Sequence, residues 1–141
     1  MMIGEIRDLE TAEIAVQAAL TGHLVLSTLH TNNAASAIPR LLDMGVKDYL
    51  LTSTVNGIMA QRLVRALCTE CRVKETPLSG LVEQLGMTDE LRQLVLGHAE
   101  VHRIEKAALE GGMRGMYEDG ARKALAGVTT IEEVLSATQV V

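Results

Sequence analysis

The chain has 141 residues, of which 48% are apolar and 22% charged; this composition supports one buried core and excludes a disordered chain. Two tyrosines are its only aromatic residues and its formal net charge is −5, so it has neither the rings that stack bases nor the basic surface that binds nucleic acid. No apolar run approaches the ~18 residues of a membrane span. We therefore expect a cytoplasmic protein that reaches a membrane only through partner proteins. We expect no nucleic-acid partner.

The N-terminal residues predict a strand, a helix and a second strand. Met1 to Gly4 is the apolar end of a strand with almost no chain before it, so we expect further residues upstream. Asp8 is a suitable N-cap for a helix over Leu9 to Leu20, which Gly22 ends. The apolar run from His23 to Leu29 lies between two helical segments and predicts a buried parallel strand.

The central residues continue this alternation. A helix is predicted up to Met44, with Pro39 either in its first turn or at a kink. The helical pattern resumes over residues 48–67, with an interruption at Asn56-Gly57 and a short strand over residues 64–67. Helix, strand and helix joined by short connections indicate an α/β fold.

The character of the sequence changes after Cys71, where a boundary divides the chain into residues 1–71 and 72–141. Thr130 and Glu133 form a capping box, which predicts the start of the last helix. The second part is predicted to contain short helices, over residues 79–85, 89–96, 99–110, 116–126 and 131–137.

Polar residues follow both predicted N-terminal strands. Glu5 and Asp8 come directly after the first strand, where α/β folds bind ligands and a carboxylate can position magnesium or an attacking water; alternatively, Asp8 only caps a helix and Glu5 is solvated. His30 follows the second strand and is expected at the same sheet edge as Glu5, where it can donate to a phosphate, unless it is a structural loop histidine. His23 begins that strand, so the two histidines need not lie close together.

The only two cysteines, Cys68 and Cys71, have the spacing of a metal or redox pair. One pair is half of a tetrahedral zinc site and the chain has no second pair, so a redox pair and two free thiols remain open alternatives. His98 and His102 lie four residues apart on a polar helix, where a solvated face is a simpler interpretation than a metal site. The sequence contains no G-x-x-x-x-G-K-[ST] and no Gly-Lys dipeptide, so the loop that cradles phosphates is absent from it.

Several strings occur in an order that is more specific than any one of them: Ile3-Gly4-Glu5-Ile6-Arg7-Asp8, Ser27-Thr28-Leu29-His30-Thr31-Asn32, Ala60-Gln61-Arg62-Leu63-Val64-Arg65 before the cysteine pair, and Thr129-Thr130-Ile131-Glu132-Glu133. In this order they resemble the ATPases of type II secretion, the general secretory pathway protein E family, and of type IV pilus assembly. The first string resembles the end of a Walker B motif and the second a histidine box. The resemblance implies the C-terminal part of a RecA-like P-loop NTPase core with few parallel strands over residues 1–71. A mainly helical C-terminal subdomain with a truncated zinc-lobe region would follow over residues 72–141.

The resemblance also implies a role for each matching residue. Glu5 matches the catalytic carboxylate that orients or activates water, and Asp8 belongs to the same motif. His30 matches the residue that contacts or senses the γ-phosphate of ATP, with His23 as the weaker member of its box. Arg62 matches a nucleotide-edge or conformational contact.

The family's remaining site elements are not in this sequence. Its P-loop lysine, aspartate box and arginine fingers would lie upstream of Met1. Cys68 and Cys71 match the first pair of a zinc site, whereas the second pair and a glycine- and arginine-rich strand are missing, so zinc could bind only with ligands absent from this chain. We place the break between Gly86 and Met87, where the matching segments stop being contiguous.

By this resemblance, the complete protein is a homo-hexameric ATPase that uses ATP and Mg²⁺ to power pseudopilus assembly, and this chain is not active alone. The hexamer would be peripheral at the inner membrane through secretion platform proteins. A type IV pilus assembly or retraction ATPase is the alternative within the family. A non-catalytic helical binding module, in which Glu5 and His30 are structural, is the alternative outside it.

Overall fold

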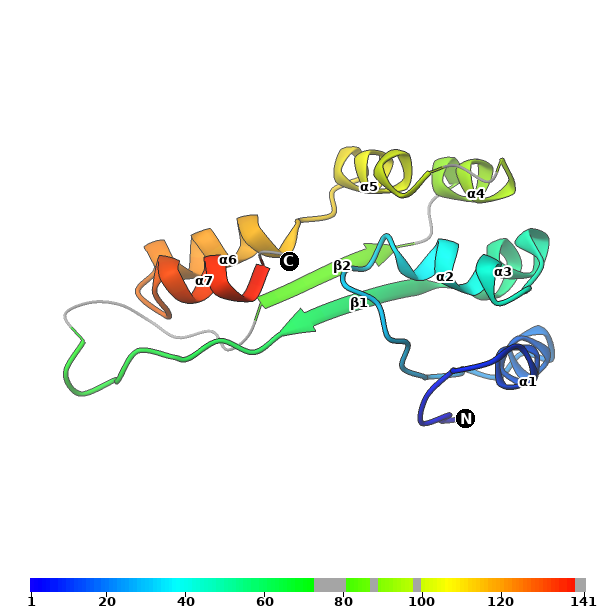
Figure 1. Ribbon diagram of the computed structural model, residues 1–141, viewed down its shortest axis with the longest axis horizontal. Coiled ribbons are helices and arrows are strands. Elements are labelled where there is room, and N and C mark those ends of the chain that lie inside the picture. The colour runs from blue at the N-terminus through cyan, green and yellow to red at the C-terminus, as the bar shows by residue number, and fades with distance from the viewer. Residues whose placement is uncertain (73–80, 87–88, 98–99, 139–141) are drawn as a thin grey trace. The chain divides into compact units, whose positions relative to one another are not determined.

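A computed structural model describes residues 1–72, 81–86, 89–97 and 100–138. The elements in chain order (Figure 1) are α1 (Leu9–Leu20), α2 (Ala37–Asp43), α3 (Asp48–Thr54), β1 (Gly57–Arg62), β2 (Leu81–Gly86), α4 (Asp89–Leu96), α5 (Val101–Glu110), α6 (Met116–Leu125) and α7 (Ile131–Thr138). They form two compact units, residues 1–58 with 85–112 and residues 59–84 with 113–141. Each unit combines segments from both sides of Cys71, and the boundary predicted there stays a prediction.

The first unit begins with two extended segments that pair in parallel. Met2 and Leu26 form a parallel bridge. Backbone hydrogen bonds run from Leu26 N to Met1 O at 3.0 Å, and from Ile3 N to Leu26 O at 2.9 Å. Farther along, Ile6 N donates to Thr28 O at 2.9 Å. The predicted parallel pairing is therefore confirmed, although it takes the form of a bridge rather than a full strand.

The prediction that the segment from His23 to Leu29 is buried is wrong. Leu24 and Leu26 are 69% and 56% exposed, and Met2 on the paired segment is 81% exposed. The apolar pattern had suggested a central strand, which needs a neighbour on each side and cover on both faces. The parallel pairing supplies one neighbour, so these side chains stay accessible.

The helices of the first unit follow from local signals. Asp8 caps α1, because its Oδ1 accepts the Thr11 N–H at 2.8 Å. Gly22 follows that helix with φ of 90°, in the left-handed region that glycine adopts without strain. Pro39 lies in the first turn of α2, which resolves the alternative of a kink.

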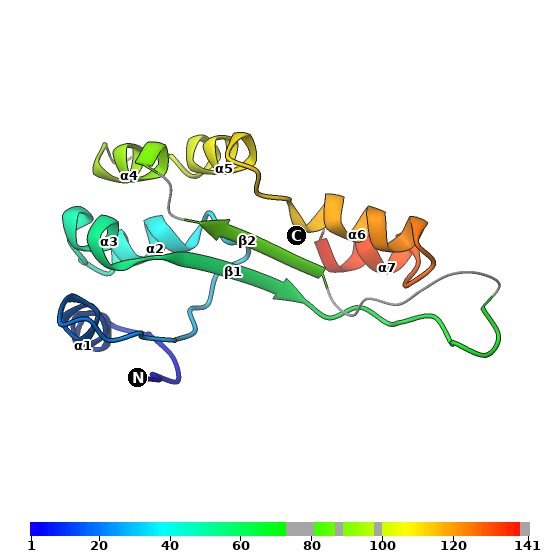
Figure 2. The same cartoon turned by 180° about the vertical axis from the view of Figure 1, so that it is seen from behind.

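Two predicted helical stretches are strands instead. Residues 57–62 form β1, and residues 81–86 form β2 where a helix over 79–85 was expected. The two strands pair in one sheet, and their arrows point in opposite directions from both sides (Figures 1 and 2). In β1, exposed and half-buried residues alternate with the period of two that a pleated strand gives. Pairing between distant segments overrides the helical propensity of each.

The short strand predicted over residues 64–67 is also absent, because these residues bond to the C-terminal part of the chain. Arg65 N donates to the carboxylate of Glu133, and Leu67 N donates to Val128 O at 2.9 Å. The break predicted after Gly86 falls at residues 87–88, and His98 of the predicted histidine pair is residue 98; both lie outside the described residues.

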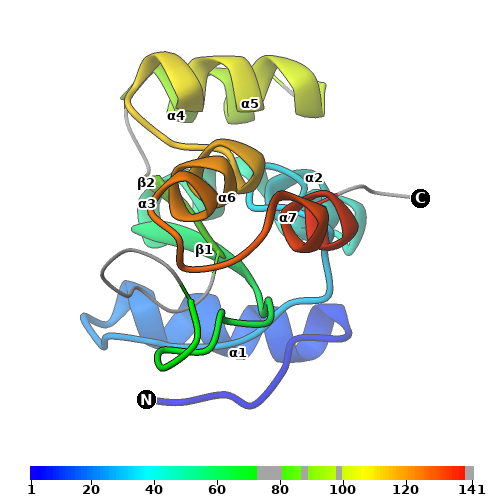
Figure 3. The same cartoon turned by 90° about the vertical axis from the view of Figure 1, so that its left-hand side faces the viewer.

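Small aliphatic side chains fill both cores. In the first unit Ile38, Leu51 and Ile104 are no more than 1% exposed. In the second unit α6 and α7 lie side by side (Figure 3), and Val134 of α7 is fully buried. Helices over 89–96, 99–110, 116–126 and 131–137 were predicted, and α4 to α7 confirm them within two residues at each end. Of the helices described, none has the length and apolar character needed to cross a bilayer.

Candidate functional site

Glu5 and His30 meet at the end of the parallel pairing. His30 Nε2 lies 2.8 Å from Glu5 Oε1, and Arg7 Nε donates to Glu5 Oε2 at 2.7 Å. Thr28 Oγ1 donates to Gly4 O at 2.7 Å, which fixes the two segments directly before these side chains. Because parallel segments end at the same edge, the residues that follow them come together, and the predicted proximity of Glu5 and His30 is confirmed.

A small pocket opens at this edge, with a volume of about 190 Å³. It is lined by Glu5, Ile6, Arg7, His30, Arg40 and Met44. Two arginines and one histidine line the pocket beside a single carboxylate, so an anion is the favoured ligand. The volume is below the ~300 Å³ of most small-molecule sites, and it therefore suits a phosphoryl group with water rather than a whole nucleotide.

Arg40 is a site residue that the sequence patterns did not predict. Arg40 lies on α2, the helix that follows the His30 loop. It is far from Glu5 in the chain, and no sequence motif connects the two residues, although both line the pocket. The signal that could have found it is positional: a cation on the helix after the histidine segment belongs to the same edge of an α/β fold as the loop itself.

The Glu5 carboxylate is held in its ionised form. The hydrogen bond from Arg7 is the main cause that lowers its pKa below the ordinary value of 4.5; desolvation opposes this shift, and the charges of Arg7 and His30 add to it. Oε1 is buried and accepts no hydrogen bond from the described residues, since the His30 ring nitrogen contacts it without the alignment of one. One oxygen of Glu5 is thus anchored, whereas the other has unused capacity to accept.

Asp8 and His23 have local partners elsewhere. The backbone N–H of Thr11 lowers the pKa of Asp8, which is the expected effect of an N-cap. His23 Nδ1 lies 3.1 Å from Thr21 Oγ1 and 3.3 Å from Ala18 O, at the C-terminal end of α1. The structure therefore gives both residues a role at the ends of α1 and does not bring His23 to Glu5.

The remaining predicted site residues lie in the second unit. Arg62, at the end of β1, donates from Nη1 to Gln61 O at 3.2 Å. Cys68 and Cys71 are free and exposed on either side of a turn. The backbone N–H groups of Cys71 and Glu70 lower the pKa of Cys68, with further contributions from the Cys71 side chain and the Arg72 charge.

Zinc does not fit the cysteine pair as the structure describes it. A tetrahedral site needs four ligands, and the described part of the chain contains no group of three or more His, Cys, Asp or Glu side chains that could hold a metal ion. The sequence supplies no further cysteine.

Comparison with known proteins gives a consistent set of matches. The family model "Type II/IV secretion system protein" matches residues 1–136. Type II secretion system protein E of Xanthomonas campestris pv. campestris is 51% identical over 175 aligned positions, which cover 99% of this chain and 31% of that protein. Type II secretion system protein HxcR of Pseudomonas aeruginosa is 52% identical over 99% of this chain and 33% of its own length. Type IV pilus assembly ATPase PilB of Thermus thermophilus is 38% identical over 98% of this chain and 20% of its own length.

Solved structures show the same likeness. The pilus retraction motor PilT with bound ADP superposes with a TM-score of 0.75 at 28% identity, over 96% of this chain and 38% of that one. The ATPase DotB of Yersinia pseudotuberculosis superposes with a TM-score of 0.77 at 28% identity, over 97% and 36%. The chain thus spans about a third of the length of the type II secretion relatives. The Xanthomonas alignment is longer than the chain itself, so that relative has residues within the aligned region that this chain lacks.

Proposed function

Because the chain belongs to the family of type II/IV secretion system proteins, we propose that Glu5 and His30 form the γ-phosphate side of an ATPase site. The complete enzyme would hydrolyse ATP to drive pseudopilus assembly in type II secretion. The observation that carries the proposal is the 2.8 Å contact between Glu5 and His30 in a pocket whose other charges are Arg7 and Arg40.

Glu5 would orient the attacking water. Its lowered pKa keeps the carboxylate charged at neutral pH, and a weak base of this kind suits positioning better than full proton removal. Phosphoryl transfer depends mostly on positioning and charge stabilisation, so an anchored carboxylate with one oxygen still able to accept is adequate.

The carboxylate also fits Mg²⁺, which prefers carboxylate oxygens and water. Glu5 Oε1 is a hard oxygen donor, buried and without a hydrogen bond from the described residues, and it would hold the ion directly or through water. When bound, Mg²⁺ supplies charge neutralisation on the phosphate oxygens.

His30 would read the nucleotide state. Its side chain is 89% exposed, so it can turn from the Glu5 carboxylate toward a ligand. A γ-phosphate offers it a competing acceptor, whereas ADP does not. Arg7 and Arg40 would stabilise the charge on the same phosphate oxygens.

The proposal extends to the assembly in which such a site works. The complete protein would be a ring of six copies on the cytoplasmic side of the inner membrane, held there by secretion platform proteins. A pilus assembly or retraction ATPase is the second candidate within the family. Two type II secretion relatives are 51% and 52% identical, above the 38% of the Thermus thermophilus pilus assembly relative, which favours the secretion branch.

The test is a chimera that joins this chain to the part of the Xanthomonas relative outside the aligned region, where we expect the rest of the site. The unsubstituted chimera should hydrolyse ATP. Glu5→Gln should keep ATP binding and lose about 10²-fold or more in kcat, the scale for a positioned acid–base group. The amide preserves the shape of the side chain but not its charge. Glu10→Gln, in the first turn of α1, is the matched control. Unchanged turnover in Glu5→Gln, or no response to ATP in the chimera, would support a binding module instead.

A further inference from the structure

The Cys68–Cys71 pair is a motif that the proposed ATPase site does not use. Both thiols are free and exposed, and the ligands that zinc requires are not found among the described residues. A structural metal site therefore does not explain the pair. We propose that Cys68 and Cys71 form a reversible disulfide within one chain, with a low-molecular-weight disulfide as the oxidant.

The turn brings the backbones of the two cysteines close together. Arg72 N donates to Cys68 O at 3.0 Å, which closes one turn of backbone around the pair. The Cα atoms of residues three apart in a tight turn lie within ~7 Å, and disulfides span Cα separations of about 4.4–6.8 Å.

Hydrogen bonds attach both ends of the turn to the connection between α6 and α7. Leu67 N, just before the pair, donates to Val128 O at 2.9 Å. Arg72 Nη1, just after it, donates to Gly127 O at 3.2 Å. Gly127 and Val128 belong to the connection between α6 and α7. With its two ends fixed, the turn has little freedom to lose when the ring closes.

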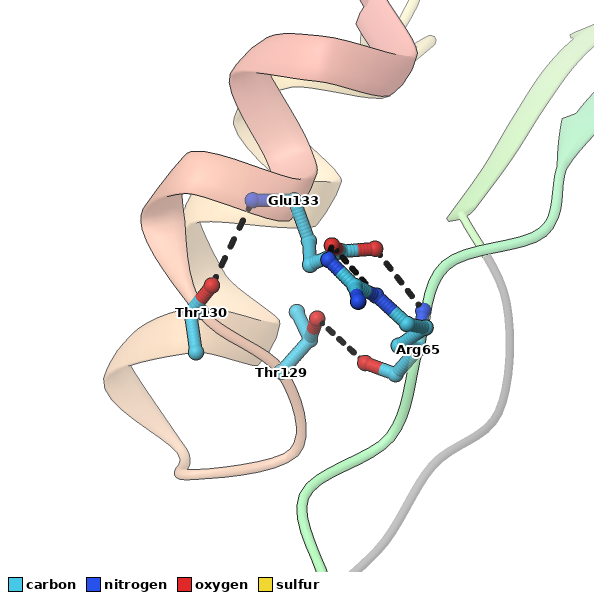
Figure 4. A network of polar contacts seen from close by, with 4 residues as sticks. All are labelled: Arg65, Thr129, Thr130 and Glu133. Carbon is cyan, nitrogen blue, oxygen red and sulfur yellow. Dashed lines mark hydrogen bonds and ion pairs between the residues drawn. The ribbon is translucent and has the colours of Figure 1, made fainter.

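The connection between α6 and α7 and the start of α7 are in turn bonded to Arg65 (Figure 4). Arg65 Nε donates to Glu133 Oε1 at 2.7 Å, and Arg65 N donates to Glu133 Oε2 at 3.1 Å. Thr129 Oγ1 returns a hydrogen bond to Arg65 O at 2.8 Å. The chain that enters the turn is thus attached to the start of α7, and closure requires no rearrangement of the helices. This favours a bond within one chain over a bond between two chains.

The exchange balances without a metal. One cysteine thiolate attacks a sulfur of the oxidant, forms a mixed disulfide and releases the first small thiol. The second thiolate attacks the cysteine sulfur of the mixed disulfide, forms the Cys68–Cys71 bond and releases the second small thiol. The protein loses two hydrogen atoms, that is two protons and two electrons, and the oxidant gains them.

The first experiment treats the reduced intact chain with oxidised glutathione and reads the product by intact mass and thiol alkylation. We expect a monomer that has lost two hydrogen atoms, retains no glutathione and resists alkylation at both cysteines. Cys68→Ser and Cys71→Ser should each stop at one retained glutathione, because the resolving thiol is gone. Stable glutathione on the unsubstituted chain, disulfide-linked dimers, or thiols protected by one bound zinc per chain would each overturn the proposal.

A second measurement separates a preorganised pair from two reactive thiols. The equilibrium constant for ring closure is measured in glutathione buffers for the native chain and for the chain unfolded in guanidinium. We expect closure to be at least tenfold more favourable in the native state. Arg72→Ala should lower the native constant several-fold, whereas Arg103→Ala, on exposed α5 surface, should not. Equal constants in the native and unfolded chains would show that the turn does not hold the pair, and would overturn the proposal.

Discussion

Glu5 has two neighbours that act on different oxygens. Arg7 anchors Oε2 and lowers the pKa, while His30 sits against Oε1. His23, by contrast, contacts Thr21 and Ala18 at the end of α1. Residues at opposite ends of a seven-residue extended segment lie about 20 Å apart at ~3.3 Å rise per residue, so His23 and His30 cannot both touch one phosphate.

This difference predicts how alanine variants behave in the chimera. His30→Ala should lower ATP turnover by about 10²-fold, the cost of removing one donor to the transferred group, and should leave ADP affinity almost unchanged. His23→Ala should be milder in turnover. Steady-state ATPase rates and ADP titration for the two variants check this. Greater damage from His23→Ala, or equal weakening of ATP and ADP by His30→Ala, would make His30 a structural residue.

At the scale of elements, α5 illustrates how one face of a short helix carries stability. Ile104 is 1% exposed, whereas Leu109 on the same helix is 44% exposed. Ile104→Ala should lower the free energy of unfolding by about 2–5 kcal/mol, through lost burial and a residual cavity. Leu109→Ala should change it by about 0.5 kcal/mol. Urea titration of the chain followed by circular dichroism measures both, and similar losses in the two variants would contradict the burial of α5.

The attachment of residues 65–67 to α7 predicts a pH dependence. The hydrogen bonds from Arg65 lower the pKa of Glu133 below its ordinary value of 4.5. The unfolded chain therefore binds this proton first on acidification, so the stabilisation is present above pH 4.5 and is lost as pH falls through the folded-state pKa. Glu133→Gln should make the free energy of unfolding less dependent on pH in this acidic range. Glu132→Gln, at the exposed neighbouring position, should not. Free energies of unfolding measured between pH 3 and 7 test this prediction. An unchanged pH dependence in Glu133→Gln would rule out the contact between Arg65 and Glu133 in solution.

For the molecule as a whole, the missing phosphate loop sets the limit of activity. The sequence has no Gly-Lys dipeptide and hence no backbone cradle with its lysine for the β- and γ-phosphates. We expect the purified 141-residue chain to show no Mg²⁺-dependent ATP hydrolysis, although it carries Glu5 and His30. Phosphate release measured with and without the chain is the check, with the chimera as positive control. Turnover by the chain alone would mean that other residues bind the phosphates.

Local signals could be interpreted from the sequence because their physics acts within one or two turns. Asp8 caps α1 through a residue three positions away, and Gly22 and Gly45 end helices through their own backbone angles. The proximity of Glu5 and His30 was also predictable, since it needs only two parallel segments that end at one edge. Arg40 was not, because nothing in its own neighbourhood links it to Glu5.

The tertiary structure decided whatever depends on partners far away in the chain. Residues 57–62 and 81–86 have helical patterns, yet they pair as β1 and β2 because each satisfies the other's backbone groups. Residues 64–67 have a strand-like pattern, but the N–H groups of Arg65 and Leu67 donate to the Glu133 carboxylate and to Val128 O. Leu24 and Leu26 look buried and are exposed, since apolar character favours burial but cannot supply the neighbours that would cover it.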